Sequence, residues 1–241
     1  MGIFKKRTAP LQVEGCLSHI AFIMDGNGRW ARRRGLARSL GHAAGAEACR
    51  RVFRRCRELG IRHVTVYAFS TENWSRPQDE VDALMKLFDR YLDDINSRFD
   101  EYDARFVFIG DKAALPESLR EKMLDIEARS LARGSEYTLN LAINYGGRDE
   151  IAAAVNTLIA DGATSVTPAD ISAHLYTSAS PDPDLIVRTA GEQRLSNFLL
   201  WQASYAELYF TDTLWPDMKN DDVDAAVRAF LTRTRRFGGV K

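Results

Sequence analysis

Short apolar runs alternate with longer helical patterns along the chain. Several runs are apolar at consecutive positions, which is typical of strands covered on both faces, as in a parallel sheet. The expected strands are His19–Met24, His63–Phe69, Arg105–Ile109, Thr138–Ile143, Leu185–Arg188 and Leu208–Phe210. This alternation predicts a single α/β domain with a mostly parallel central sheet of about six strands, flanked by helices.

The helices are predicted from apolar spacing and from residues typical of helix ends. Apolar residues from Cys49 to Leu59 repeat at helical spacing, and Gly60 is a suitable stop. Thr167 followed by Pro168 predicts a helix start. The longest helix is expected from Glu80 to about Tyr102, with one apolar stripe. That stripe fits either core packing or the wall of a hydrophobic channel, and the pattern alone does not separate the two.

Length and charge narrow the class of protein. A chain of 241 residues suits one domain. A formal net charge of zero argues against a protein that coats nucleic acid or an acidic membrane. We find no apolar run long enough for a signal peptide or a transmembrane helix, so a cytoplasmic location is expected. Cys49 and Cys56 lie two helical turns apart, too far for a disulfide.

Residues 1–17 are expected to form a basic flexible tail ahead of a domain at 18–241. The basic residues Lys5, Lys6 and Arg7 could touch anionic lipid, or they could simply be solvated.

The first strand ends in a turn rich in glycine and arginine. Asp25 follows the strand, and Gly26 and Gly28 flank Asn27. Glycine lets backbone N–H groups approach an anion, and arginines such as Arg29 can fork onto phosphate oxygens. A carboxylate among phosphates needs a cation, and Mg²⁺ held by one carboxylate and substrate phosphates is a common solution. The alternative is a tight turn with solvated arginines. His42, expected just ahead of the first helix, fits a structural or a functional role equally well.

Two further strands end in polar clusters. The second is followed by a hydroxyl, an amide, an aromatic ring and an arginine within residues 70–76, which form either part of a site or a turn that caps the long helix. The fifth is followed by Arg188, Arg194 and Ser196 around a glycine, which makes a second anion site plausible. Glu207 lies beside the last strand and needs either a metal or an ion pair with one of these arginines.

Together these stretches resemble the cis-prenyltransferases, and most closely the bacterial undecaprenyl diphosphate synthases. The matching blocks occur in family order from about His19 to Gly238. They are HIAFIMDGNGRWA with RSLGH, YAFSTENWSRP, NLAINYGGRDEI and LIVRTAGEQRLSNFLLWQASYAELYF with LWPD. Gln193 stands where some members have histidine, which leaves a metal role at that position open.

The resemblance implies a Mg²⁺-dependent enzyme that condenses isopentenyl diphosphate onto an allylic diphosphate, with farnesyl diphosphate as the inferred starter. Asp25 and Asn73 would take part in catalysis, and Asp25 and Glu207 would serve the metal. The allylic diphosphate would be cradled by Gly26, Asn27, Gly28, Arg29, Arg38 and His42, and Trp30 would also bind substrate. The loop above the reacting carbons would be ordered by Ser70, Asn73, Trp74 and Arg76, and Thr71 and Glu72 would also bind substrate. Isopentenyl diphosphate would be held by Arg188, Arg194 and Ser196.

The family also implies a hydrophobic tunnel and a homodimer. The tunnel would be lined by Ala68, Leu84, Leu87, Phe88 and Leu139. The segment from Arg236 to Gly238 resembles one that reaches the partner's substrate site, so the C-terminal end is expected at the dimer interface. Product length and the proton-abstracting base stay open.

Three rival interpretations are weaker. A trans-prenyltransferase needs DDxxD motifs, which Asp93 and Asp94 do not provide. A non-catalytic partner of the same fold should lack Asp25 or the glycine turn. An RNA-binding module predicts surplus positive charge, and the net charge is zero.

Overall fold

A central sheet of six parallel strands organises the computed structural model, which describes residues 11, 13 and 15–234. The strand order is β3-β4-β2-β1-β5-β6. The strands are β1 (His19–Ile23), β2 (His63–Ser70), β3 (Arg105–Ile109), β4 (Thr138–Tyr145), β5 (Leu185–Arg188) and β6 (Glu207–Phe210). The predicted sheet is confirmed, with strand ends shifted by one or two residues.

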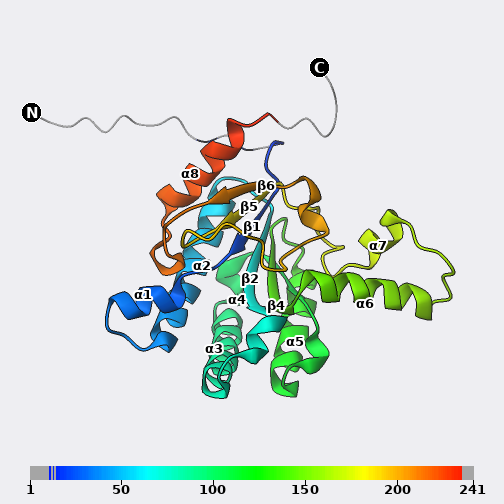
Figure 1. Ribbon diagram of the computed structural model, residues 1–241, viewed down its shortest axis with the longest axis horizontal. Helices are drawn as coiled ribbons and strands as arrows, with labels where there is room; N and C mark the ends of the chain where they lie inside the picture. The colour runs from blue at the N-terminus through cyan, green and yellow to red at the C-terminus, as the bar shows by residue number, and fades with distance from the viewer. Residues whose placement is uncertain (1–10, 12, 14, 235–241) are drawn as a thin grey trace, which may run out of the picture.

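Helices cover both faces of the sheet (Figure 1). The α-helices are α1 (Asn27–Arg33), α2 (Arg38–Glu58), α3 (Gln78–Ser97), α4 (Phe99–Tyr102), α5 (Glu117–Arg133), α6 (Gly147–Ala160), α7 (Pro168–His174) and α8 (Asn220–Leu231). Short 3₁₀ turns are η1 (Thr71–Ser75), η2 (Lys112–Ala114), η3 (Gln202–Tyr205) and η4 (Trp215–Asp217). In β1, Ile20 and Phe22 pack into the core shared with α2, α3, α5 and α8, whereas Ala21 and Ile23 face a second, smaller core. Burial on both faces explains the consecutive apolar residues.

The predicted helix from Glu80 to Tyr102 is wrong in its extent. The helix α3 ends at Ser97, and Arg98 has non-helical angles of φ −117° and ψ 25° before the short α4. The Ser97 hydroxyl donates to the carbonyl of Asp94 at 2.9 Å. Hydroxyl side chains compete for backbone groups in this way and favour a helix end.

The other helix signals are largely confirmed. The helix α2 ends at Glu58, and Gly60 follows with a left-handed φ of 79°. The hydroxyl of Thr167 accepts from the N–H of Asp170 and caps α7. Cys49 and Cys56 are buried free thiols.

His42 lies inside α2 rather than ahead of it, and close packing explains why a glycine precedes it. A Cβ on Gly41 would lie 2.2 Å from the carbonyl oxygen of Asn27, and a Cβ on Gly45 would lie 2.4 Å from Asn27 Oδ1. Trp215 Nε1 donates to the carbonyl of Gly45 at 2.8 Å. The two glycines therefore let α2 pack directly on the turn that follows β1.

The domain was expected to begin at residue 18, but two residues ahead of that position already pack into it. Val13 and Leu17 are buried in the core. The basic residues Lys5 to Arg7 and the segment Arg236 to Gly238 lie outside the described residues, so the expectations for them stay predictions. Within the described part of the chain, no helix is both long and apolar enough to span a membrane.

Candidate active site

The site lies beside β1, at the point where the strand order changes direction: β2 to β4 lie on one side of β1, and β5 and β6 lie on the other. The strands β2 and β5 flank β1, and ligands of open α/β sheets bind at the carboxyl ends of strands at such a point. Ile23, the last residue of β1, is in register with Arg188, the last residue of β5. Arg188 Nη2 donates to Asp25 Oδ2 at 3.1 Å. The sheet therefore brings the predicted carboxylate and the predicted arginine together.

Arg188 is a buried hub. Its Nη1 donates to Ser196 Oγ at 2.8 Å and to the carbonyl of Arg194. Only 5% of its side chain is exposed, and its Nε is buried without a partner among the described residues. The guanidinium thus ties Asp25 to the loop that carries Ser196.

Asp25 also faces a second arginine. Arg29 Nη2 lies 3.4 Å from Asp25 Oδ1, and Arg29 Nη1 donates to the carbonyl of Ala190 at 2.7 Å. Gly26 has a left-handed φ of 108°, and a Cβ there would lie 3.1 Å from that of Ala190. Only glycine fits this turn without strain.

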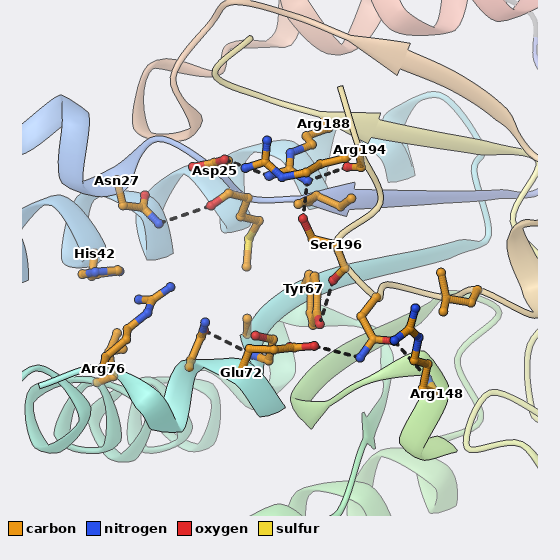
Figure 2. Close-up of a pocket in the computed structure, with 18 residues that line it drawn as sticks. Asp25, Asn27, His42, Tyr67, Glu72, Arg76, Arg148, Arg188, Arg194 and Ser196 are labelled. Atoms are coloured by element: carbon orange, nitrogen blue, oxygen red, sulfur yellow. Dashed lines mark hydrogen bonds and ion pairs between the residues drawn. The ribbon is translucent and has the colours of Figure 1, made fainter. Parts of the chain in front are cut away.

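Two polar cavities share Asp25. The larger, of about 710 Å³, lies below Arg188 (Figure 2). The other has a volume of about 440 Å³. The larger is lined by Asp25, Asn27, His42, Tyr67, Ser70, Glu72, Asn73, Arg76, Arg148, Arg188, Arg194, Ser196 and Asn197, with apolar neighbours. The other is lined by Met24, Asp25, Gly26, Asn27, Gly28, Arg29, Arg32, Leu36, Arg38, His42 and Arg76. Each cavity is lined by several arginine side chains and therefore suits an anionic ligand.

Besides Arg188 Nε, two further buried polar atoms at these cavities have no partner among the described residues, namely Asn27 Oδ1 and His42 Nε2. Burial, with smaller contributions from Arg38 and Arg76, lowers the pKa of His42 to about 4. The imidazole is therefore neutral near pH 7 and offers one ring nitrogen to a ligand.

The segment after β2 forms η1 over the larger cavity. Ser70 and Asn73 form a reciprocal cap, in which the Ser70 N–H donates to Asn73 Oδ1 at 3.2 Å. Arg76 pairs with Glu80 at 2.8 Å, and Glu80 also pairs with Arg38 at 3.1 Å. The predicted cap to the long helix is wrong, because the Ser70–Asn73 cap closes η1, whereas α3 begins after Pro77 without a side-chain cap. The same segment also lines the cavity. A register shift in β2 at Phe69 accompanies this turn.

An apolar cavity of about 70 Å³ adjoins the larger polar one, since both are lined by Met24, Ala68 and Leu84. Leu87 and Phe88 also line the apolar cavity, as predicted for the tunnel. Leu139 does not, because it lies near the amino end of β4, whereas Leu141 and Ile143 further along the same strand line the cavity.

Three other predicted residues point elsewhere. Trp30 Nε1 donates to Asp217 at 2.7 Å, Trp74 Nε1 donates to Asn144 at 2.7 Å, and Thr71 Oγ1 donates to Asp149 at 3.1 Å. None of the three lines the two polar cavities.

Glu207 is also separated from Asp25. It begins β6 and is in register with Leu185, at the opposite end of β5 from Arg188. Its carboxylate pairs with Arg233 at 2.7 Å. An ion pair, the expected alternative to a metal, is therefore present. Its arginine is Arg233, which follows α8, and not one of the arginines after β5. Within this chain Glu207 is not placed to share a metal with Asp25.

Sequence reasoning missed three polar side chains that line the larger cavity, Tyr67, Arg148 and Asn197. Arg148 follows Gly146 and Gly147 directly after β4, which is the same strand–glycine–arginine pattern as the turn after β1. That repetition could have identified it. Among the described residues, its guanidinium has no hydrogen-bonding partner.

The residues fit a Mg²⁺ ion held mainly by its ligand. Asp25 has 29% of its side chain exposed and lines both polar cavities. No group of three or more metal-binding side chains occurs among the described residues. One carboxylate plus diphosphate oxygens is a normal Mg²⁺ environment.

Comparisons with known proteins identify the family of this chain. The prenyltransferase family model described as "Putative undecaprenyl diphosphate synthase" matches residues 23–238. An isoprenyl transferase of Fusobacterium nucleatum is 51% identical over 223 residues, which cover 92% of this chain and 96% of the relative. One from Neisseria gonorrhoeae is 47% identical over 220 residues, covering 91% and 88% of the two chains.

Solved structures show the same fold. Lavandulyl diphosphate synthase from Lavandula x intermedia, in complex with dimethylallyl diphosphate, has a TM-score of 0.87 at 35% identity and covers 92% of this chain and 98% of its own. A probable undecaprenyl diphosphate synthase from Campylobacter jejuni has a TM-score of 0.79 at 35% identity, with the same coverage. The chain belongs to the undecaprenyl diphosphate synthase family of prenyltransferases.

Proposed function

We propose that this prenyltransferase carries out Mg²⁺-dependent cis-prenyl chain elongation. It would condense isopentenyl diphosphate repeatedly onto an allylic diphosphate, with farnesyl diphosphate as the starter. The product would be a long-chain polyprenyl diphosphate such as undecaprenyl diphosphate, the precursor of the lipid carrier for cell-wall polysaccharides. The observation that carries the proposal is that two cation-lined cavities share Asp25 and adjoin an apolar cavity.

The two polar cavities would hold the two diphosphates. The smaller, with the glycine turn, Arg29 and Arg38, would take the allylic diphosphate. The larger, with Arg188 and Arg194, would take isopentenyl diphosphate. Holding both substrates replaces a bimolecular encounter by a reaction within one complex.

In each round the allylic C1–O bond breaks, and its electron pair leaves with the diphosphate. The double bond of isopentenyl diphosphate supplies the electrons for the new bond between its C4 and the allylic C1. A proton then leaves C2 to form the new double bond. Arg29 and Arg38 would stabilise the charge that builds on the leaving diphosphate. Mg²⁺, when bound at Asp25, would add a compact positive charge to the same oxygens. The departing diphosphate, or a network of Asp25 and Asn73, could accept the proton.

The growing chain would enter the apolar cavity between α2, α3 and the sheet. Its volume of about 70 Å³ is small for a long hydrocarbon, so elongation would require α2 and α3 to move apart. The partly buried side chains of Met85, Phe88 and Tyr91 on α3 would line the widened space. Burial of each added CH₂ is worth about 0.8 kcal/mol, so product release would become slow.

The same proposal includes a homodimer in the cytoplasm. The strand β6 is an edge strand whose residues are only partly buried, and Tyr205 just before it is 69% exposed. An unpaired edge with exposed apolar groups suits pairing with a second chain. The zero net charge gives no support for binding to nucleic acid.

Release of an apolar product would bring the enzyme into transient contact with a membrane. Leu36 and Leu40 are 40% and 51% exposed, and Arg32 and Arg33 are exposed beside them. Leucine and arginine together suit an anionic lipid surface. Flotation with anionic and neutral vesicles tests this, since binding to neither would exclude the contact.

The central experiment is incubation of purified protein with farnesyl diphosphate, labelled isopentenyl diphosphate and Mg²⁺. A long polyprenyl product is expected, and it should vanish with Asp25→Ala or with a chelator. The chain length of this polyprenyl diphosphate would also identify the product. A folded, dimeric protein that makes no product would overturn the proposal.

A further inference from the structure

Asn197 joins three segments that surround the larger polar cavity. Its Nδ2 donates to Glu72 Oε1 in η1 at 2.9 Å. Its Oδ1 accepts from the N–H of Arg148 at 2.9 Å, and its carbonyl accepts from the N–H of Gly147 at 2.7 Å, both at the start of α6. One asparagine therefore links the loop after β5 with the segments after β2 and β4. We call Asn197, Glu72 and the two N–H groups the clasp.

The local sequence is adapted to this contact. A Cβ on Gly146 would lie 2.5 Å from Asp149 Oδ2 and 2.7 Å from both Asn197 Nδ2 and Thr71 Oγ1. A Cβ on Gly147 would lie 3.0 Å from Leu200 and 3.1 Å from the Asn197 carbonyl oxygen. The two glycines leave the room that the clasp needs. Asn197 has a left-handed φ of 62°, a conformation that asparagine tolerates better than most residues.

The clasp bears directly on the substrate-binding side chains. Ser196, which accepts from Arg188, immediately precedes Asn197 and also has a left-handed φ, of 50°. The Tyr67 hydroxyl lies 3.4 Å from the Ser196 carbonyl oxygen and 3.1 Å from that of Tyr145, and these two oxygens share its one hydrogen. Burial acts to raise the pKa of Glu72, but hydrogen bonds, of which that from Asn197 is the largest, outweigh it and lower the pKa. Glu72 is therefore a charged acceptor, which strengthens its bond to Asn197.

We infer that Asn197 is a positioning residue that fastens the loop of residues 194–200 to η1 and α6, so that the isopentenyl diphosphate pocket is held in shape only while the clasp is closed. This inference rests on the proposed assignment of that pocket to isopentenyl diphosphate.

The direct test is Asn197→Asp. Aspartate keeps the size, the tolerance of a left-handed φ and an oxygen for the Arg148 N–H, but it places a second carboxylate against Glu72. The affinity for isopentenyl diphosphate, measured by calorimetry without an allylic substrate, should fall about tenfold. Because no turnover is involved, this reading stands apart from whether the protein elongates chains. In the turnover assay KM for isopentenyl diphosphate should rise likewise, while KM for the allylic substrate stays unchanged.

The matched control is the double variant Asn197→Asp with Glu72→Gln. Glutamine can donate to the new aspartate, so the affinity should return to within about threefold of Glu72→Gln alone. Loss of rescue, wild-type affinity in Asn197→Asp, or an equal rise in both KM values would overturn the inference.

A second route covers the case in which Asn197→Asp does not fold. Gly146 has a φ of −149°, which alanine adopts freely. Gly146→Ala should displace Asn197 from Glu72, together with the neighbouring side chains of Asp149 and Thr71, and lower the affinity for isopentenyl diphosphate in the same way. An unchanged affinity in a folded Gly146→Ala protein would contradict the inference.

Discussion

Lowering the pH from 7 to 5 should destabilise the protein through His19, a fully buried residue at the start of β1. Its Nδ1 lies 2.6 Å from the Pro181 carbonyl, and its Nε2 lies 2.7 Å from Thr65 Oγ1. A carbonyl can only accept, so Nδ1 carries the hydrogen and Nε2 accepts from the Thr65 hydroxyl. Asn140 Nδ2 in turn donates to Thr65 Oγ1 at 3.0 Å. The neutral ring is thus satisfied, and a second proton would have to displace the Thr65 hydrogen.

The size of the effect follows from the pKa. Burial lowers the pKa of His19 from 6.5 to about 4, with a smaller opposing effect of the hydrogen bond to Pro181; His63 lowers it further and Asp184 raises it. The unfolded chain therefore binds the proton first. Stability is complete above pH 6.5 and is lost as the pH falls towards 4. Proton linkage gives a loss of about 2 kcal/mol in the free energy of unfolding between pH 7 and pH 5.

Urea unfolding at the two pH values, for the wild type and for His19→Gln, isolates this contribution. Glutamine retains a donor and an acceptor but does not titrate. Other groups, including His42 and His63, titrate in both proteins, so their effect cancels in the comparison. The wild type should lose about 2 kcal/mol more than the variant between pH 7 and pH 5. Equal losses in the two proteins would refute the reasoning.

Three further predictions concern the site. Arg188→Lys keeps the charge but cannot reach Asp25, Ser196 and the Arg194 carbonyl together. The value of kcat/KM in the product assay should therefore fall about 100-fold, and an unchanged value would contradict the role of Arg188 in linking these three groups. Gly45→Ala places a Cβ 2.4 Å from Asn27 Oδ1 and should cost about 1–3 kcal/mol in thermal unfolding, with the exposed Ser39→Ala as control. Arg148→Gln should raise KM for isopentenyl diphosphate about tenfold at unchanged stability, whereas an unchanged KM would place its guanidinium outside the substrate contacts.

The sheet and the polar residues at the ends of its strands could be predicted because both can be recognised from residue types alone. A strand buried on both faces is mostly apolar, so β1 and β4 are recognisable without a partner even though they contain the buried polar residues His19, Asn140 and Asn144. Parallel strands then bring their carboxyl ends to one edge, which places Asp25 beside Arg188 as soon as both strands are identified.

Glu207 shows where this reasoning needs the register. The sequence places Glu207 just before a predicted strand, but it does not say whether that strand runs parallel to the others, and so at which edge of the sheet Glu207 lies. The pairing of Glu207 with Leu185 puts it at the first of the four positions of β6, three residues before the carboxyl end and next to Arg233. The break of α3 at Arg98 is similar, because the apolar stripe continues across it and only the backbone angles reveal the interruption.

Asn197 was missed for a different reason. Side chains that bind an anion can be recognised by type, as with Arg188, but a residue that holds loops together is defined by what its neighbours' backbone does. Two of the three hydrogen bonds of Asn197 go to N–H groups of α6, and its φ is left-handed. Neither property is visible in the letters of the sequence. The glycines at 146 and 147 are the trace that the contact leaves, since close approach of another segment is a physical reason to exclude a Cβ there. Paired glycines after a buried strand therefore indicate a second segment packed against that turn, even when the sequence does not identify it.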